Sequence, residues 1–156
     1  MTQILWILRH GDAEPHDAKP DAERELTPRG EQQSRDAGAA LAKLGVELAA
    51  CFTSPKVRAR DTARLACDSL GADPVEHPPL HSGFDAGDAR ELLAGFGKDD
   101  RILIVGHEPD LSQVVHDLTG ARVDLKKGGV AAVRDGELIV LLRPRELNAV
   151  ANAGTT

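Results

Sequence analysis

The chain has 156 residues, 41% hydrophobic and 28% charged, a balance typical of one globular domain rather than of a disordered chain. Its formal net charge of −6 argues against a nucleic-acid surface, so affinity for an anion has to come from local arginines. The longest apolar run is too short to span a bilayer and the N-terminus lacks a signal-peptide pattern, so we expect a cytoplasmic protein without a membrane partner.

The first predicted unit is a buried strand followed by a helix. Residues 4–8 form an apolar run of strand length. Thr27 followed by Pro28 is typical of a helix start, because threonine can accept a hydrogen bond from the first turn and proline has no N–H to leave unpaired. Gly45 supplies the left-handed residue that commonly ends a helix.

A second strand and helix are predicted by similar signals. Residues 50–53 predict the strand. Pro55 opens a helix whose apolar positions recur every three or four residues until Gly71. Arg58 is then expected in the first turn of this helix, close to the carboxyl edge of the sheet.

The same order of strand, turn, proline and helix occurs once more. Residues 72–85 are rich in proline and glycine and predict an irregular connection, with a short helix over residues 89–96. Residues 101–106 predict the third strand. A helix that follows Pro109 is predicted to end at Gly120.

The C-terminal part predicts a hairpin, with strands over residues 129–133 and 137–143 joined by an Asp-Gly turn. Residues 145–156 contain little that can be buried and predict a flexible tail, which leaves residues 1–144 as a single domain. Alternating strands and helices followed by a hairpin predict an α/β fold, namely a three-layer α/β/α sandwich on a mixed, mostly parallel sheet.

Cations and imidazoles follow three of the predicted strands. Arg9 and His10 come directly after the first strand, Arg58 follows the second and His107 follows the third. Open α/β sheets bind ligands at the carboxyl ends of their strands, so these side chains are predicted to share one pocket. Two arginines can hold a phosphoryl group through bidentate hydrogen bonds, and a neutral imidazole can attack phosphorus. The pattern therefore indicates a phosphate site.

Four motifs, in this order, resemble those of the histidine phosphatase superfamily, and more narrowly those of its SixA-type phosphohistidine phosphatase branch. They are Arg9-His10-Gly11-Asp12-Ala13, Thr53-Ser54-Pro55-Lys56-Val57-Arg58-Ala59-Arg60-Asp61-Thr62-Ala63, Gly106-His107-Glu108-Pro109-Asp110-Leu111-Ser112 and Leu125-Lys126-Lys127-Gly128-Gly129. The resemblance covers nearly the whole chain. It implies the phosphoglycerate-mutase-like fold and a metal-independent phosphatase that needs no cofactor.

The resemblance also implies a role for each site residue. His10 is the nucleophile and becomes phosphorylated transiently, while Arg9 and Arg58 clamp the phosphoryl oxygens. His107 donates a hydrogen bond to a phosphoryl oxygen that gains charge in the transition state. Gly11 lets the backbone turn sharply and belongs, with Arg9, Arg58 and His107, to the expected substrate-binding set.

Residues next to the first motif admit a different interpretation. Asp12, Glu14, His16 and Asp17 resemble a set of metal ligands. A divalent metal would compete with the arginines for the same phosphate charge, and the resembling family is metal-independent. We therefore expect no metal site.

Two further positions have two interpretations each. Glu108 is interpreted as a carboxylate at a helix N-terminus, with a proton donor as the alternative. Lys126 and Lys127 are interpreted as a solvated strand edge, with a place at the rim of the pocket as the alternative.

The chain lacks a clear general acid. Many larger members of the superfamily carry an acid/base carboxylate on an insertion after the second helix, where this chain offers only Asp85, Asp88 and Glu91. A weak acid catalyst suits phosphohistidine, whose P–N bond is labile and whose leaving imidazole takes up its own proton readily. We therefore expect a phosphatase that hydrolyses phosphohistidine on a protein through a covalent phosphohistidine intermediate of its own.

Two alternatives stay open. One is a small-molecule phosphomonoesterase on the same scaffold, and the other is a phosphate-binding module without turnover. A sugar-phosphate mutase is disfavoured, because Asp12 and Ala13 stand where that branch carries asparagine and hydroxyl residues.

Overall fold

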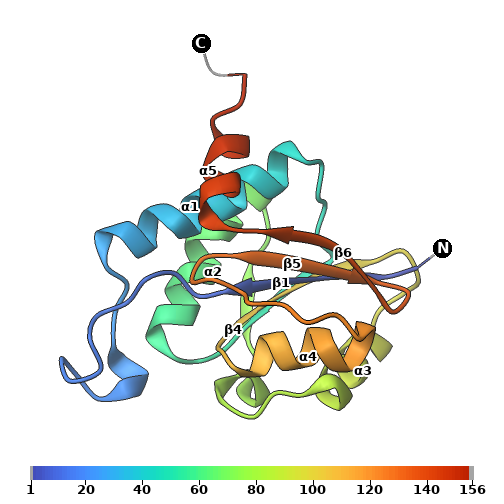
Figure 1. Cartoon of the computed structure of the whole chain (residues 1–156), viewed down its shortest axis with the longest axis horizontal. Helices are drawn as coiled ribbons and strands as arrows, with labels where there is room; N and C mark the ends of the chain where they lie inside the picture. Colours follow the sequence, from blue (N-terminus) through green and yellow to red (C-terminus); the bar gives the residue numbers. More distant parts are fainter. Residues whose placement is uncertain (1, 155–156) are drawn as a thin grey trace.

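The computed structural model describes residues 2–154 and is built around one six-stranded sheet (Figure 1). Its strands are β1 (Ile4–Arg9), β2 (Ala50–Thr53), β3 (Pro74–Glu76), β4 (Arg101–Gly106), β5 (Val130–Arg134) and β6 (Glu137–Leu142). Their order across the sheet is β3-β2-β4-β1-β5-β6. The first four strands pair in parallel, whereas β5 is antiparallel to both β1 and β6. The predicted α/β class and mixed, mostly parallel sheet are confirmed.

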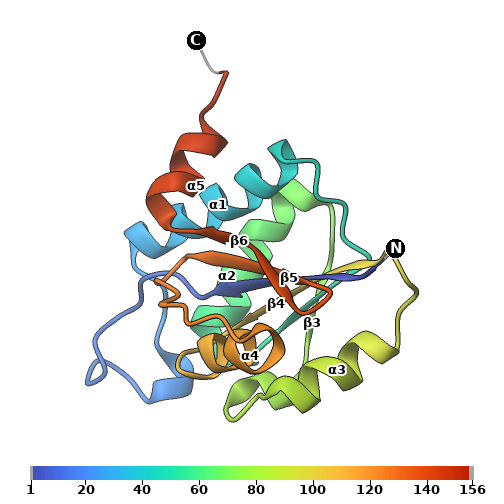
Figure 2. The ribbon, with the colours of Figure 1, turned by 45° about the vertical axis from the view of Figure 1, so that its right-hand side comes forward.

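Helices cover both faces of the sheet (Figures 1 and 2). On one face lie α1 (Pro28–Lys43), α2 (Val57–Leu70) and α5 (Pro144–Ala151), and on the other lie α3 (Ala86–Ala94) and α4 (Asp110–Thr119). This arrangement is the predicted three-layer sandwich. Within residues 2–154, none of the helices is both long enough and apolar enough to cross a membrane.

Alternation along β1 divides the core into two halves. Trp6 and Leu8 pack on the side of α1 and α2, while Leu5 and Ile7 pack on the side of α3 and α4. Successive side chains of a strand point to opposite faces, and both faces are covered here, so the run has to be apolar throughout. The buried strand therefore holds its last residue, Arg9, firmly at the sheet edge.

Helix ends and the hairpin turn follow local sequence rules. The Thr27 hydroxyl accepts a hydrogen bond from the Gly30 N–H at 3.1 Å and so caps α1. Gly71 ends α2 in the left-handed conformation, with φ 66°. Asp135 and Gly136 both have positive φ, as a two-residue turn between twisted strands requires.

The C-terminal segment differs from the flexible tail predicted for residues 145–156. Residues Pro144–Ala151 form α5, which packs on α1 with Leu147 fully buried in the core. Asn148 Nδ2 also donates to Asp36 Oδ2 of α1 at 3.0 Å. A helix this short needs few apolar side chains to pack on an existing core. Its hydrophobic pattern in the sequence is therefore weak evidence for a helix. The predicted tail is therefore wrong as far as residue 151, and residues 155 and 156 lie outside the described residues.

The connection between α2 and α3 is more regular than predicted. Within residues 72–85, Pro74–Glu76 pair with β2 as the edge strand β3, and Pro78–His81 form a turn of 3-10 helix. Three residues are too few to show a strand periodicity, and Val75 in this strand is 55% exposed. This strand was therefore not recognisable from its pattern.

Candidate active site

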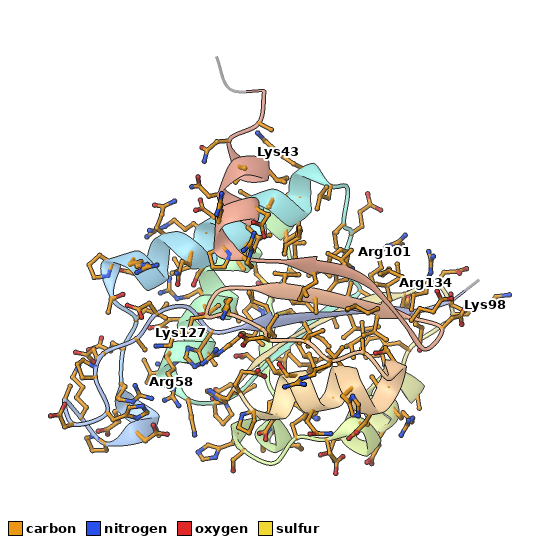
Figure 3. All side chains as sticks on the ribbon, viewed as in Figure 1. Lys43, Arg58, Lys98, Arg101, Lys127 and Arg134 are labelled. Carbon is orange, nitrogen blue, oxygen red and sulfur yellow. The ribbon has the colours of Figure 1, made fainter. Side chains whose placement is uncertain are left out.

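The carboxyl ends of β1, β2 and β4 meet at one edge of the sheet, beside a cavity of about 140 Å³. This catalytic cavity is lined by Arg9, His10, Ala13, His16, Arg24, Arg58, His107, Glu108 and Lys127. Figure 3 shows Arg58 and Lys127 at this edge. The structure thus brings together the four side chains expected to carry the chemistry, although they come from three distant segments of the chain.

His10 lies directly after β1, and one hydrogen bond fixes its ring. Nδ1 lies 2.7 Å from the carbonyl oxygen of Gly11. A carbonyl only accepts, so Nδ1 donates and carries the proton, and Nε2 keeps its lone pair. His10 therefore has the tautomer that a nucleophilic imidazole needs.

Burial keeps both imidazoles of the cavity neutral. Desolvation is the largest cause that lowers the pKa of His10 from 6.5 to about 3, and the charges of Arg58 and Arg9 lower it further. The hydrogen bond to Gly11 acts in the opposite direction. Desolvation also lowers the pKa of His107, and further causes are the charge that His10 gains in acid and the charge of Arg58. Neither ring needs to lose a proton before it can act at neutral pH.

Arg9 is held in place by the loop that precedes β5. Its Nη1 donates to the Leu125 carbonyl at 3.0 Å, and its backbone N–H donates to the Gly129 carbonyl at 3.1 Å. The Gly128 N–H lies 3.1 Å and 3.0 Å from the carbonyl oxygens of Arg9 and His10. The fourth motif, residues 125–129, therefore holds Arg9 and His10 of the first motif in place from the loop before β5.

Arg58 reaches the cavity from the first turn of α2. Its Nη1 donates to the Asp21 carbonyl at 2.7 Å, and its Nη2 lies 3.4 Å from Asp21 Oδ2. The same carboxylate lies 2.9 Å from Lys56 Nζ and 3.1 Å from Arg24 Nη2. The hydrogen bond from Lys56 is the main reason that the pKa of Asp21 lies well below its usual range. Asp21 therefore positions three cations beside the cavity.

His107 follows β4 and contacts Ser54 at the end of β2. Its Nε2 lies 2.7 Å from Ser54 Oγ, which also accepts a hydrogen bond from the Lys56 N–H at 3.2 Å. A neutral imidazole carries one N–H, and the serine hydroxyl can either accept it from Nε2 or donate its own hydrogen to Nε2. The ring centroids of His10 and His107 are 5.2 Å apart. His107 therefore has an N–H donor close to the nucleophile.

Several residues that line this cavity contain a buried nitrogen without a hydrogen-bond partner. Four buried side-chain nitrogens have no hydrogen-bond partner within residues 2–154, and three of them are Arg9 Nε, Arg58 Nε and His107 Nδ1. The fourth, Trp6 Nε1, lies in the core. A buried N–H without a partner costs free energy, so such groups need an acceptor. Three of these four nitrogens therefore belong to residues that line the catalytic cavity.

Gly11 lies next to the cavity and is not one of the residues that line it. Its carbonyl holds the His10 ring, and its N–H donates to Thr62 Oγ1 at 3.1 Å. A Cβ on Gly11 would lie 2.5 Å from the Gly30 carbonyl oxygen, so a larger residue does not fit. These contacts position the nucleophile, and the expected contact between Gly11 and substrate stays a prediction.

Glu108 is the one carboxylate among the residues that line the catalytic cavity. Its Oε1 accepts from the Ser112 N–H at 2.7 Å and its Oε2 accepts from the Ser112 hydroxyl, so it also serves the N-terminus of α4. Asp85 and Asp88 accept from each other's backbone N–H at the start of α3. Like Glu91, they lie outside the cavity lining.

Of the four residues that resemble metal ligands, Asp12 and Glu14 contact other side chains, whereas His16 lines the catalytic cavity. Within residues 2–154, no group of three or more histidine, cysteine and acidic side chains is arranged to hold a metal ion. Asp12 Oδ2 accepts from the Thr27 hydroxyl at 2.8 Å, and Asp12 Oδ1 lies 3.6 Å from Lys127 Nζ. Glu14 pairs with Lys19 at 3.0 Å.

Sequence reasoning missed Asp21, Arg24 and the role of Ser54. Ser54 lies inside the second motif, where its proximity to a strand end was an available signal. Asp21 is 37 residues from Arg58 on an irregular segment, so nothing in the sequence links the two. For Lys127, the structure favours the alternative interpretation, because this side chain lines the cavity.

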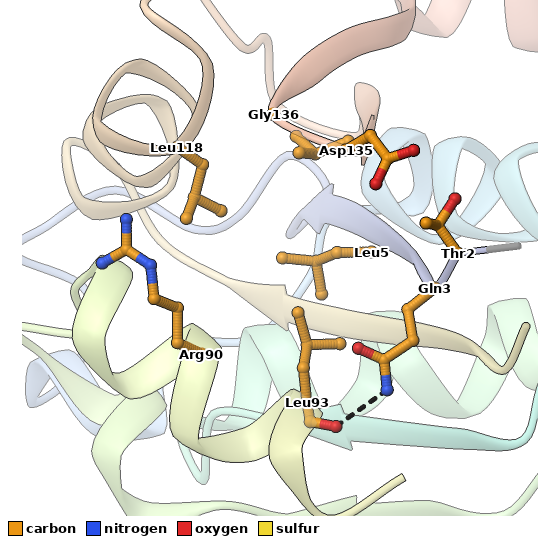
Figure 4. Close-up of a pocket in the computed structure, with 9 residues that line it drawn as sticks. Thr2, Gln3, Leu5, Arg90, Leu93, Leu118, Asp135 and Gly136 are labelled. Carbon is orange, nitrogen blue, oxygen red and sulfur yellow. Dashed lines mark hydrogen bonds between the residues drawn. The ribbon is translucent and has the colours of Figure 1, made fainter. Parts of the chain in front are cut away.

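A larger cavity, of about 380 Å³, lies at the opposite end of β1, next to the turn between β5 and β6 (Figure 4). Leu5, Leu93 and Leu118 form its apolar part, and Gln3 Nε2 donates to the Leu93 carbonyl at 2.8 Å. Its lining contains no histidine and no cysteine. It therefore lacks the nucleophile and the unpaired donors that mark the catalytic cavity.

The two neutral imidazoles predict how stability depends on pH. His10 and His107 have lowered pKa values when folded and ordinary values near 6.5 when unfolded, so below pH 6.5 the unfolded chain binds more protons. The free energy of unfolding should then fall as the pH drops, by up to about 1.4 kcal/mol per pH unit and histidine. The lowered pKa of Asp21 also contributes to the free energy of unfolding. This contribution is lost only at lower pH, as the pH falls below the ordinary pKa of a carboxyl group.

Denaturant unfolding at a series of pH values measures this effect. In His10→Gln, the slope between about pH 6 and pH 5 should be roughly half that of the unsubstituted protein, because one of two buried imidazoles is gone. A slope that does not change with this substitution would mean that His10 is protonated in the folded state.

Comparison with known proteins agrees with this geometry. The family model "Histidine phosphatase superfamily (branch 1)" matches residues 5–92. An uncharacterized protein from Picosynechococcus is 32% identical, over 92% of this chain and 98% of its own. A structure of the protein histidine phosphatase SixA complexed with tungstate is 26% identical, with a TM-score of 0.80 over 92% of this chain and 99% of its own. A phosphoserine phosphatase from Entamoeba histolytica, in complex with 3-phosphoglyceric acid, is 15% identical, with a TM-score of 0.70 over 94% of this chain and 100% of its own.

Proposed function

Because this chain belongs to the histidine phosphatase superfamily, we propose that it hydrolyses phosphohistidine on a protein substrate. The observation that carries the proposal is a neutral His10 in a cavity that Arg9, Arg58 and His107 also line. The similar SixA structure is a complex with tungstate, which is a tetrahedral oxyanion like phosphate. That similarity supports an oxyanion site in this fold.

In the first step, His10 Nε2 attacks the phosphorus atom of the substrate phosphohistidine. A new P–N bond forms to His10, and the P–N bond to the substrate imidazole breaks. The leaving imidazole keeps the electron pair of that bond and takes up a proton. Arg9, Arg58 and His107, which line the cavity together with His10, stabilise the phosphoryl oxygens by donating hydrogen bonds to them.

In the second step, water attacks the phosphorus atom of phosphorylated His10. The P–N bond to Nε2 breaks, inorganic phosphate leaves, and the water proton that is lost passes to solvent. Nε2 of His10 regains its lone pair. The proton on Nδ1 stays there throughout, hydrogen-bonded to the Gly11 carbonyl. The low pKa of His10 favours this neutral product.

The hydrogen bonds that Glu108 accepts favour phosphohistidine over a phosphate ester as the substrate. An alkoxide leaving group needs a proton donor in the transition state, whereas an imidazole leaves without strong assistance. Glu108 is the carboxylate in the cavity lining, and both its oxygens accept hydrogen bonds from Ser112. The site is therefore better equipped to hold and attack the phosphoryl group than to protonate an alcohol.

A small-molecule phosphomonoesterase is the second candidate. The place of Glu108 in the cavity lining favours it, because a carboxyl group close to the reacting atoms is the usual proton donor to a leaving alcohol. A phosphate-binding module without turnover is disfavoured by the neutral nucleophile. The cytoplasmic location and the absence of nucleic-acid and membrane partners stay predictions.

We further propose that turnover needs no metal and no cofactor. Arg9, Arg58 and His107 supply the positive charge and the donors that a divalent ion would otherwise provide. In a buffer with EDTA, the protein should therefore release phosphate from a phosphohistidine peptide at its full rate. An alkaline quench during turnover, which preserves the P–N bond, should show phosphate on His10 by peptide mass spectrometry.

Three results of these experiments would contradict a metal-independent mechanism with His10 as the nucleophile. Loss of activity in EDTA that a divalent ion restores would return Asp12, Glu14 and His16 to the role of metal ligands. Phosphate on a residue other than His10 would move the nucleophile. Full turnover without any trapped phosphoenzyme, under conditions where the second step is slowed, would favour direct attack by water.

A further inference from the structure

A second cavity, of about 490 Å³, opens beside the catalytic cavity and shares Arg9 and Lys127 with it. We call it the basic groove, and it is lined by Arg9, Asp12, Arg29, Gln33, Lys126, Lys127, Arg143, Pro144 and Arg145. Its volume exceeds that of the catalytic cavity more than threefold. The groove therefore has room for parts of a substrate that lie next to the phosphoryl group.

The groove is positively charged, whereas the whole protein has a negative net charge. Six of the nine lining residues are lysine or arginine and one, Asp12, is acidic, whereas the chain has a net charge of −6. Three of the six cations pair with a neighbouring carboxylate, namely Lys126, Lys127 and Arg143. Arg29 and Arg145 take part in none of the ion pairs found among residues 2–154. The groove thus keeps an excess of positive charge.

The fold places these cations next to the site from separate segments. Arg29 lies in the first turn of α1 and Arg145 in the first turn of α5, and these two helices pack side by side (Figures 1 and 2). Lys127 belongs to the loop that holds Arg9, so it connects the groove to the catalytic cavity. Burial of Leu147 against α1 therefore also sets the position of Arg145.

We propose that the basic groove binds acidic side chains that flank the phosphohistidine of the protein substrate, an inference that rests on the proposed function. The groove cations Arg29, Lys127 and Arg145 are exposed, whereas Arg58 and His10 in the catalytic cavity are buried. A buried, enclosed site suits a small phosphoryl group. An exposed row of long cationic side chains suits carboxylates presented on the surface of a partner protein.

Two phosphohistidine peptides of equal length test the inference, one with glutamates on both sides of the phosphohistidine and one with glutamines. At low salt, the unsubstituted protein should show a kcat/KM about tenfold higher for the glutamate peptide. The preference should shrink at about 0.5 M salt, because exposed charges are screened. In Arg29→Glu/Arg145→Glu, the ratio of the two kcat/KM values should fall to about one.

The double variant Lys98→Glu/Arg134→Glu is the matched control. It changes the net charge by the same amount at the opposite end of the sheet, where Figure 3 shows both side chains far from Lys127. This control should keep the preference for the glutamate peptide. Equal turnover of both peptides by the unsubstituted protein, or a preference that survives in Arg29→Glu/Arg145→Glu, would overturn the inference.

Two further measurements separate the inference from the proposed function. If neither phosphohistidine peptide is hydrolysed, the proposed function fails, and the groove is then judged by binding of both peptides to His10→Ala, where the same tenfold preference is expected. Equal turnover of the peptides, together with inhibition by inorganic triphosphate that Arg29→Glu/Arg145→Glu relieves, would assign the groove to a small polyanion and contradict the inference.

Discussion

His10→Ala should lose at least about a thousandfold in kcat, because the substitution removes the atom that forms the bond to phosphorus. The residue is 7% exposed and its side chain is hydrogen-bonded only to the adjacent Gly11 carbonyl, so the substitution breaks no hydrogen bond between distant segments. Removal of a buried neutral imidazole should even lessen the acid sensitivity of the protein. Phosphate release from a phosphohistidine peptide, with circular dichroism as a check on folding, measures the effect.

His116→Ala provides the control for this prediction. It makes the same chemical change on the exposed surface of α4 and should leave kcat within about twofold. If His10→Ala keeps even about a tenth of the original activity while it remains folded, His10 is not the nucleophile.

Arg58→Lys should lose tens- to hundreds-fold in kcat/KM, about 2 to 3 kcal/mol of transition-state stabilisation, although it keeps the charge. The planar guanidinium lines the cavity while its two Nη atoms contact Asp21, so it faces two partners at once. An ammonium is a single point and cannot reach both positions. Steady-state kinetics with a phosphohistidine peptide measures the loss.

Arg64→Lys is the matched control for Arg58→Lys, because Arg64 lies on the same helix and is exposed. Its kinetics should not change. Unchanged kinetics of Arg58→Lys itself would show that Arg58 serves only to hold Asp21 and takes no part in binding the phosphoryl group.

Those parts of the site that follow strand ends could be predicted from the sequence. The apolar runs of β1 and β4 indicate buried strands, and parallel strands of one sheet bring their carboxyl ends to the same edge. Arg9, His10 and His107 therefore meet for a reason that short-range patterns reveal. Arg58 joins them because Pro55 marks the start of the helix that carries it, although α2 begins two residues later, at Val57.

The parts that depend on irregular segments could not be predicted. Asp21 belongs to a short 3-10 turn, and its place beside Arg58 and Lys56 results from how the loop after β1 folds over the sheet edge. Helix α5 was missed because it contributes Leu147 as its one fully buried side chain. With α5 treated as a tail, Arg145 was left out, and the basic groove could not be anticipated.

For Glu108, the sequence predicts the position of the side chain and leaves its role in catalysis open. Its place after His107 and before a helix was evident from the sequence, and both interpretations put it at the start of α4. The structure adds that Ser112 donates to both carboxylate oxygens, and that the side chain still lines the cavity. Whether Glu108 acts as a proton donor or only as a helix N-terminal carboxylate depends on the substrate. A leaving group of high pKa needs a proton donor, and one of low pKa does not.

The measurement that tests the central claim most directly is the dependence of kcat/KM on the leaving group. A phosphohistidine peptide, aryl phosphates of graded phenol acidity and a phosphoserine peptide form the series. We expect kcat/KM to fall steeply as the pKa of the leaving group rises, with the phosphohistidine peptide at least about a hundredfold ahead of the phosphoserine peptide. A flat dependence would contradict the account, since it would require an efficient acid in the cavity, with Glu108→Gln as the first variant to examine, and would identify the protein as a small-molecule phosphomonoesterase.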